Sequence, residues 1–185
     1  MMTLDNCMTV GDSWASGVVA GSGCGWPLLL GIPDALRQAV SGSTAQQWAM
    51  DFDGRLTRAA RTQADVVVIS LLGNDAMAAM TDGAVTVRDV ADGLKHLRCV
   101  IEEVRKPRTI VMLYADPFVG LQTRFAVAVQ MLNVAICSQL PPGVETFDTR
   151  TVLRHEHFDA RDIHPNADGH VAIARALGAM IGGAA

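Results

Sequence analysis

Residues 65–72, with the sequence DVVVISLL, restrict the fold of this chain more than any other segment. The run is nearly continuous in apolar residues, is rich in β-branched side chains and stops at Gly73. Such a run is typical of a strand that is buried on both faces, as in a parallel sheet covered by helices. The segment therefore predicts a central strand of a parallel sheet.

Short apolar runs elsewhere predict further strands, separated by segments with helical character. The other strand candidates are residues 7–10, 109–114, 144–147 and 35–40. The helix candidates are residues 44–61, residues 87–105 with Thr86 as N-cap, residues 125–140, and a last helix near the C-terminus. This last helix begins near Pro165 or Asn166, includes Val171, Ala174 and Leu177, and ends at the glycines 182–183. This alternation predicts an α/β fold, with one domain over residues 1–185 and helices on both faces of the sheet.

Charge, hydropathy and cysteine spacing narrow the classes of function. The formal net charge is −4 and the lysines and arginines form no basic run, so nucleic-acid binding has no electrostatic support. No apolar run reaches the ~18 residues that a membrane span needs. The N-terminus lacks the basic and apolar regions of a secretory signal, so we expect a cytoplasmic protein with reduced thiols. The cysteines form no CxxC pair and lie at no finger-like spacing from a histidine, which argues against a zinc site. No feature of the sequence fixes an oligomeric state.

Polar residues follow the predicted strands, at the edge where parallel α/β sheets bind their ligands. The tripeptide Gly11-Asp12-Ser13 comes directly after the first strand. A serine on a sharp turn from strand to helix has an exposed hydroxyl and an available backbone N–H, as a hydrolase nucleophile requires. An ordinary turn that caps a helix has the same composition. Alone, the tripeptide favours this second interpretation.

Two more polar segments have the same ambiguity when each is taken alone. Gly73-Asn74-Asp75 follows the central strand, and the Asn74 amide can donate a hydrogen bond to a developing oxyanion; the alternative is a common Gly-Asn turn. His164 precedes the last helix and is fixed by Pro165, which suits proton transfer; the alternative is a solvated histidine beside an N-cap. The other histidines lie on helix faces or in a polar loop: His96, His155, His157 and His170.

Together, four ordered segments resemble the sequence blocks of the SGNH, or GDSL-like, hydrolases. They are GDS at residues 11–13, SGST at residues 41–44, GND at residues 73–75 and HPN at residues 164–166. The stretch SGSTAQQ at residues 41–47 is similar to the second block of the bacterial thioesterase, lysophospholipase and arylesterase branch. The resemblance spans residue 10 to about residue 170, and four ordered motifs at strand ends are far more specific than one.

The resemblance implies a fold and a set of roles. The fold is a flavodoxin-like three-layer α/β/α sandwich with about five parallel strands. Ser13 is the nucleophile, and His164 is first the base and then the acid. The backbone N–H groups of Ser13 and Gly42 form the oxyanion hole with the Asn74 side chain. The implied activity is hydrolysis of a small-molecule carboxylic ester, with no metal and no cofactor.

One position departs from the family's pattern. The acid partner of the histidine usually lies three residues before it, and here that residue is Arg161. A carboxylate must reach Nδ1 of the imidazole to fix its tautomer and to stabilise the imidazolium. Asp162 can reach His164 through a shortened turn, or Asp159 can reach it from further back. Otherwise a backbone carbonyl or a water orients the ring, and Ser13 and His164 act as a dyad.

The sequence leaves the substrate open. Trp14, Met77 and Phe118 are candidates to line an acyl pocket, and they can equally be ordinary core or lid residues. Because the chain is too short for a large lid domain, we expect a small cleft and short-acyl esters, with thioesters and O-acetylated sugars included. Two alternatives remain: a binding module that keeps the pocket without a complete triad, and an acyltransferase that uses the same residues.

Overall fold

The computed structural model describes residues 4–19, 21, 23–81, 87–115, 124–159 and 162–183. Its sheet has four parallel strands in the order β1-β2-β3-β4. The strands are β1 at Cys7–Gly11, β2 at Val66–Ser70, β3 at Arg108–Leu113 and β4 at Val144–Asp148. They lie at four of the predicted places, and the predicted parallel α/β fold is confirmed.

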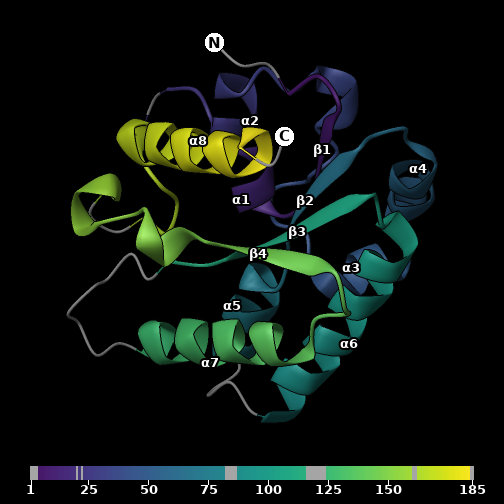
Figure 1. The fold of residues 1–185 in the computed structure, drawn as a ribbon. Helices are drawn as coiled ribbons and strands as arrows, with labels where there is room; N and C mark the ends of the chain where they lie inside the picture. The colour runs from purple at the N-terminus through teal and green to yellow at the C-terminus, as the bar shows by residue number, and fades with distance from the viewer. Residues whose placement is uncertain are drawn as a thin grey trace.

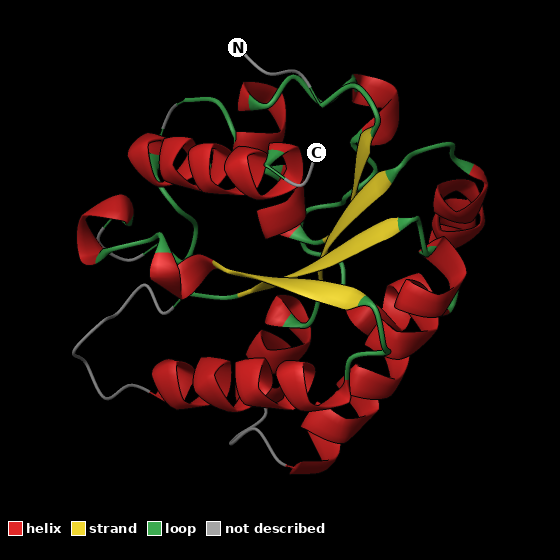
Figure 2. Ribbon diagram, viewed as in Figure 1, coloured by secondary structure: helices red, strands yellow, loops and turns green. Residues whose placement is uncertain are grey.

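Helices cover both faces of this sheet (Figure 1). They are α1 at Ser13–Ser16, α2 at Trp26–Leu29, α3 at Ala45–Ala49, α4 at Arg55–Arg61, α5 at Gly73–Thr81, α6 at Val87–Val104, α7 at Arg124–Gln139 and α8 at Ala167–Gly182. Helices α1, α2 and α8 lie on one side of the strands, and α3, α5, α6 and α7 lie on the other (Figure 2). The central strands are buried on both faces because apolar helices pack against each.

The predicted fifth strand at residues 35–40 is wrong. The segment begins with a 3₁₀ turn at Asp34–Leu36 and pairs with the edge of β1 only through an isolated bridge between Thr9 and Arg37. Two backbone hydrogen bonds, from Gln38 to Thr9 and from Val40 to Gly11, continue the contact. The described sheet therefore has one strand fewer than expected, with an irregular segment along its outer edge.

The single helix predicted over residues 44–61 is also wrong. Thr44 caps α3 with a capping box that includes Gln47, but the helix ends before Asp51, which has a left-handed φ of 53°. Gly54 is also left-handed, with φ 67°. The Asp51 carboxylate then accepts hydrogen bonds from the backbone and the hydroxyl of Thr57 at 3.0 and 2.6 Å. The Asp51 side chain thus holds the first turn of α4, which begins at Arg55, and helix propensity alone did not reveal this break.

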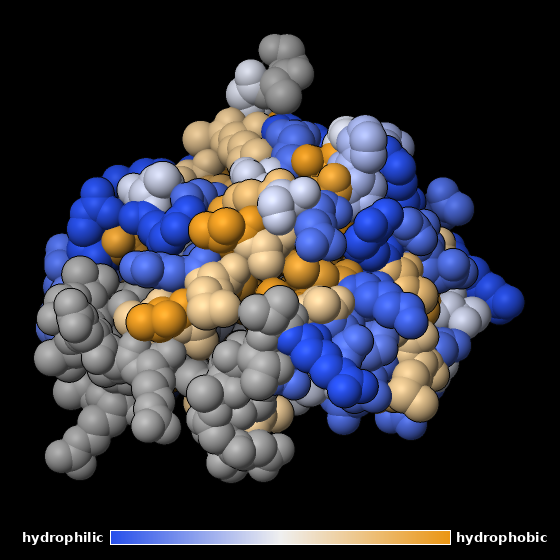
Figure 3. All heavy atoms as spheres, turned by 90° about the horizontal axis from the view of Figure 1, so that it is seen from below, coloured by the Kyte–Doolittle hydropathy of each residue, from blue (hydrophilic) through white to orange (hydrophobic). Residues whose placement is uncertain are grey.

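The last two helices bury their apolar stripes as expected, with one exception in α8. In α8 the buried side chains include His170, Ile173, Ala174 and Leu177, whereas Val171 is 45% exposed. Helix α7 carries the exposed apolar residues Val127, Met131 and Val134. Seen from below, apolar residues lie in the middle of the molecule's face between hydrophilic ones (Figure 3).

Among the described residues, none of the helices has the length and apolar character needed to cross a membrane.

Candidate active site

Ser13 lies on a tight turn between β1 and α1. The turn begins at Gly11, where φ is +131° and an added Cβ would lie 1.9 Å from the carbonyl oxygen of Ser70. No other residue fits there, because β1 and β2 approach too closely at this point. Asp12 caps α1 by accepting a hydrogen bond from the backbone N–H of Trp14 at 3.0 Å. Ser13 is the first residue of the helix, so its own N–H has no acceptor within α1.

Hydrogen bonds tie the turns that carry Gly42 and Asn74 to the nucleophile turn. The Ser43 hydroxyl donates to the Gly11 carbonyl at 2.9 Å, and the Asn74 side-chain amide donates to the Ser43 carbonyl at 2.9 Å. Gly42 has a left-handed φ of +81° and nothing within 4 Å of the position of a Cβ. An amide has two N–H donors, so Asn74 keeps one for another acceptor. The structure therefore brings these three predicted site residues to one edge of the sheet.

Asp75, the third residue of the GND segment, anchors a neighbouring helix. Its carboxylate accepts a hydrogen bond from the backbone N–H of Ala45, at the start of α3, at 2.9 Å. Burial raises the pKa of Asp75, although this hydrogen bond opposes the shift. Since α3 follows the Gly42 turn directly, the contact fixes that turn relative to β2.

Asp162 lies against His164 despite the two-residue spacing. One carboxylate oxygen, Oδ1, lies 2.7 Å from Nδ1 of the His164 ring and also accepts a hydrogen bond from the His164 backbone N–H at 2.9 Å. A side chain that accepts from the backbone two residues later is an Asx-turn, and this turn shortens the path to the ring. Asp159 is exposed, and its backbone carbonyl accepts from the Asp162 N–H at 3.1 Å. Arg161 lies outside the described residues.

The Asp162 contact has an electrostatic consequence. Burial by itself raises the pKa of Asp162, but the hydrogen bonds from the backbone and the ring of His164 outweigh it and hold the pKa below its usual value. A carboxylate that stays ionised fixes the proton of a neutral histidine on Nδ1 and leaves Nε2 as an acceptor. No hydrogen bond joins Ser13 Oγ to the His164 ring in the described structure; such contacts are often long until substrate binds.

The other histidines have different surroundings. His170 is fully buried, with Nδ1 accepting from the backbone N–H of Trp26 at 3.2 Å and Nε2 lying 2.9 Å from the Val18 carbonyl. Burial lowers its pKa, and the neighbouring His164 adds to the shift. Nδ1 of His157 accepts from the backbone of Arg154. Of the five histidines, His164 alone has a carboxylate within hydrogen-bonding distance among the described residues.

A narrow, mainly apolar pocket opens beside Ser13. Its lining includes Trp14 and Met77, two of the three residues predicted for it; Phe118 lies outside the described residues. The remaining described residues of the lining are Asp12, Ser13, Gly73, Asn74, Ala76, Tyr114, Ala115, Ala128, Val129, Leu132 and Ile163. The predicted nucleophile and the predicted oxyanion donor thus share one cavity of about 20 Å³, which is room for about one water molecule.

A buried polar cluster that no sequence motif marks lies beside this pocket. The Tyr114 hydroxyl lies 2.5 Å from Asp12 Oδ2, and the Ser70 hydroxyl lies 3.0 Å from both Asp12 Oδ1 and the Tyr114 oxygen. The backbone N–H of Gly73 donates to the same tyrosine oxygen at 3.2 Å. The cluster therefore joins the turn that bears the nucleophile to the turn that bears Asn74. Tyr114 is the chain's only tyrosine and directly follows β3, so its position in the sequence was an available signal.

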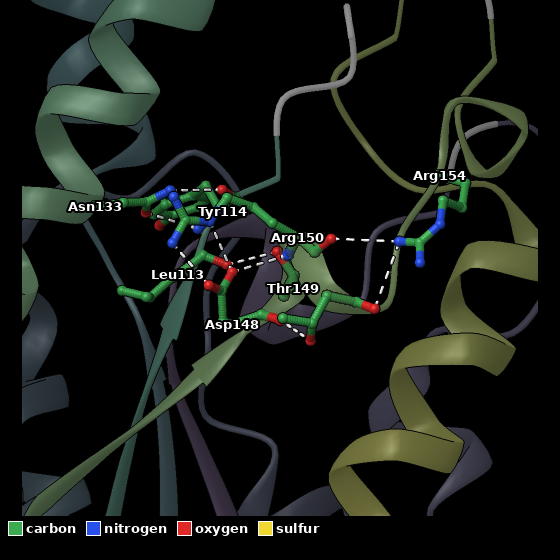
Figure 4. A network of polar contacts seen from close by, with 8 residues as sticks. Leu113, Tyr114, Asn133, Asp148, Thr149, Arg150 and Arg154 are labelled. Carbon is green, nitrogen blue, oxygen red and sulfur yellow. Dashed lines mark hydrogen bonds and ion pairs between the residues drawn. The ribbon is translucent and has the colours of Figure 1, made fainter.

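Asn133 on α7 holds Tyr114 in place. Its side-chain oxygen accepts from the Tyr114 backbone N–H at 3.0 Å, and its amide donates to the Tyr114 carbonyl at 2.7 Å (Figure 4). Thr149 donates to the Leu113 carbonyl at 2.5 Å and ties the end of β3 to the segment after β4. A buried asparagine with both groups satisfied fixes a backbone position. In the sequence, the polar Asn133 among the apolar residues of α7 was the available indication of this role.

Asp12→Asn should make stability less dependent on pH. Burial raises the pKa of Asp12 to about 6, in spite of its hydrogen bonds with Tyr114, Ser70 and Trp14. The folded carboxyl thus keeps a proton that the unfolded chain, with a pKa of 3.8, has lost, so this group's contribution to stability falls as the pH rises from about 4 to 6. In urea unfolding, the variant should gain about 1–2 kcal/mol relative to wild type between pH 5 and pH 8. Parallel stability curves for the two proteins would contradict this assignment.

Comparison with known proteins places this geometry in a family. Residues 9–172 match the model of the GDSL-like lipase/acylhydrolase family. No curated protein matches the chain. Among solved structures, a catalytic mutant of an acetylxylan esterase from Geobacillus stearothermophilus is similar, with a TM-score of 0.69, 16% identity and coverage of 98% of this chain and 96% of that one. A lipase from a goat rumen metagenome gives 0.67, 19% identity and 97% coverage of both chains.

The structural matches share the fold at low identity, and the family match covers most of the sequence. That match includes Ser13, Gly42, Asn74 and His164, the residues from which the resemblance was first drawn. The chain therefore belongs to the GDSL-like lipase/acylhydrolase family and is a carboxylic ester hydrolase.

Proposed function

We propose that this protein hydrolyses small or short-acyl carboxylic esters through an acyl-enzyme on Ser13, with His164 as base and Asp162 as the acid that orients it. The observation that carries the proposal is the 2.7 Å contact between Asp162 Oδ1 and His164 Nδ1. Through this contact His164 has a carboxylate partner, although the family's usual sequence position for that partner holds Arg161. It also supports catalysis over the alternative of a non-catalytic binding module, for which Arg161 was the reason.

The first half of the reaction forms the acyl-enzyme. His164 Nε2 takes the proton of Ser13 Oγ while that oxygen attacks the carbonyl carbon of the ester. The carbonyl oxygen becomes negative and accepts hydrogen bonds from the backbone N–H groups of Ser13 and Gly42 and from the Asn74 amide. The imidazolium, stabilised by Asp162, then gives its proton to the leaving alkoxide as the carbon–oxygen bond breaks.

The second half uses water in place of the serine. His164 takes a proton from a water molecule, whose oxygen attacks the acyl carbon and forms a second tetrahedral intermediate held by the same donors. Collapse of that intermediate breaks the bond to Ser13 Oγ, which regains its proton from His164. The products are a carboxylic acid and the free enzyme.

Small acyl groups fit the pocket beside Ser13 better than long ones. Its walls are side chains such as Trp14, 5% exposed, whose ring lies edge-on to Tyr114 with centroids 5.3 Å apart. Such a packed pair resists opening. One structurally similar protein is an acetylxylan esterase, which supports the inclusion of O-acetylated sugars among the substrates to be tested.

The proposal is tested with the wild-type protein and two reagents. We expect turnover of p-nitrophenyl acetate and covalent labelling by a fluorophosphonate probe, because the activated hydroxyl displaces fluoride from phosphorus. Mass spectrometry of the digested adduct should place the label on the peptide that contains Ser13. A protein that is folded by circular dichroism and gives neither turnover nor label would overturn the proposal.

A further inference from the structure

We propose that the pocket between α5 and α7 holds the acyl chain of the substrate, and that Ala76, Ala128 and Leu132 form the end wall that sets the length of that chain. This inference rests on the proposed function, since it needs Ser13 to be the nucleophile. It adds residues of α7 that no sequence motif marked.

One end of the pocket is polar and the rest is apolar. Ser13 and Asn74 line it at the edge of the sheet, where the reacting carbonyl would lie. Beyond them its walls are Met77 from α5 and Val129 from α7. Asp12 and Tyr114 also line the pocket, but their polar atoms are hydrogen-bonded to each other. An apolar chain therefore meets apolar walls and leaves no polar group of the cluster newly unpaired.

A second cavity lies behind the first, among α5, α6 and α7. Its lining consists of Leu72, Asp75, Ala76, Asp89, Val90, Gly93, Ala128 and Leu132. Three of these residues, Ala76, Ala128 and Leu132, also line the pocket beside Ser13. Their exposed fractions are only 8%, 4% and 4%. They therefore form the partition between the two spaces, and two of the three are alanines, whose size a substitution can easily change.

The direction of the reaction assigns this pocket to the acyl group and not to the alcohol. The leaving oxygen must lie beside His164 to receive its proton. The described lining reaches Ile163 but not His164 itself, whereas Asn74, the proposed donor to the carbonyl oxygen, lines the pocket directly. The alcohol therefore leaves on the side of His164, and the acyl chain points between α5 and α7.

Two substitutions change the partition in opposite directions. Ala128→Val adds volume to the end wall, and Leu132→Ala removes it and joins the two cavities. Ala135→Val and Val134→Ala are matched controls on the same helix, at positions that line neither cavity. Ala135 is half-buried and Val134 is 67% exposed. Thermal unfolding of all four variants shows which of them are folded.

The readout is the ratio of kcat/KM values for p-nitrophenyl esters of different acyl length. Ala128→Val should lower the propionate-to-acetate ratio about tenfold or more, and Leu132→Ala should raise the butyrate-to-acetate ratio by a similar factor, because one methylene in a pocket changes specificity by roughly 10–200-fold. The controls should keep the wild-type ratios. If one variant fails to fold, the other still tests the partition.

The outcomes separate this inference from the proposed function. Wild-type turnover with unchanged ratios in a folded Ala128→Val or Leu132→Ala variant overturns the acyl-pocket assignment alone. A series of alkyl acetates, in which only the alcohol varies, provides the second arm. If the variants change selectivity in that series and not in the acyl series, the pocket holds the alcohol and the assignment is wrong. A folded wild-type protein that hydrolyses no ester overturns both proposals.

Discussion

Ser13→Ala should lower kcat for p-nitrophenyl acetate by a factor on the order of 10⁵–10⁶, the scale seen when a triad serine is removed. The alanine methyl group cannot form the acyl-enzyme, so any remaining turnover comes from water attack within the oxyanion hole. The change removes only an oxygen from a side chain that makes no hydrogen bond within the described structure, so the variant should fold normally. Initial rates and circular dichroism measure the two expectations together.

Ser16→Ala is the matched control for this loss. Ser16 lies on the same short helix, and its hydroxyl donates to the Ser13 carbonyl at 3.0 Å. Its removal should change kcat by less than about tenfold, since one neutral hydrogen bond contributes about 1 kcal/mol. A Ser13→Ala protein that retains more than a hundredth of the wild-type kcat, with labelling by the fluorophosphonate unchanged, would place the nucleophile elsewhere.

The strands could be predicted because buried strands appear in the sequence as short, uninterrupted runs of apolar residues. Val67, Val68 and Ile69 of β2 are fully buried, and no polar residue interrupts them. The segment at residues 35–40 has the apolar character of a strand but lies at the sheet edge, where a few hydrogen bonds to β1 replace a full ladder. The break at Asp51 depends on hydrogen bonds that its carboxylate accepts from Thr57 in the first turn of α4. Propensity summed along the chain does not detect such a local competition.

The site was predictable to the extent that it follows strand ends. Ser13 lies two residues after the end of β1, and Asn74 lies at the start of α5, four residues after the end of β2. Parallel strands place such residues at one edge of the sheet. The cluster beneath them was not predictable, because Asp12 and Tyr114 are 102 residues apart in sequence. The pocket wall on α7 had no motif either. Alanines such as Ala128 carry no chemical signal, and only packing shows that one of them borders a cavity.

Asp162→Asn should lower kcat about 10⁴-fold, which is the scale for a triad carboxylate replaced by its amide. The contact with Nδ1 requires an acceptor there, and an amide can present either its oxygen or its NH₂ group. If the oxygen keeps the Asx-turn, the negative charge that stabilises the imidazolium is still lost. If the NH₂ group faces the ring, the histidine takes the wrong tautomer and Nε2 no longer accepts the serine proton. Single-turnover acylation rates measure the loss at the step where it acts.

Asp159→Asn provides the comparison that decides between the alternatives. Asp159 is exposed, and in the described structure its backbone carbonyl, not its side chain, accepts a hydrogen bond. Its variant should therefore keep kcat within about threefold of wild type, as for other exposed substitutions. A large loss at Asp159 with a small one at Asp162 would transfer the acid role to the more distant carboxylate. A change below tenfold at both would mean that Ser13 and His164 act as a dyad. The 2.7 Å contact between Asp162 and His164 favours a large loss at Asp162 and none at Asp159. A charged acceptor at that distance strengthens the hydrogen bond that proton transfer to His164 requires.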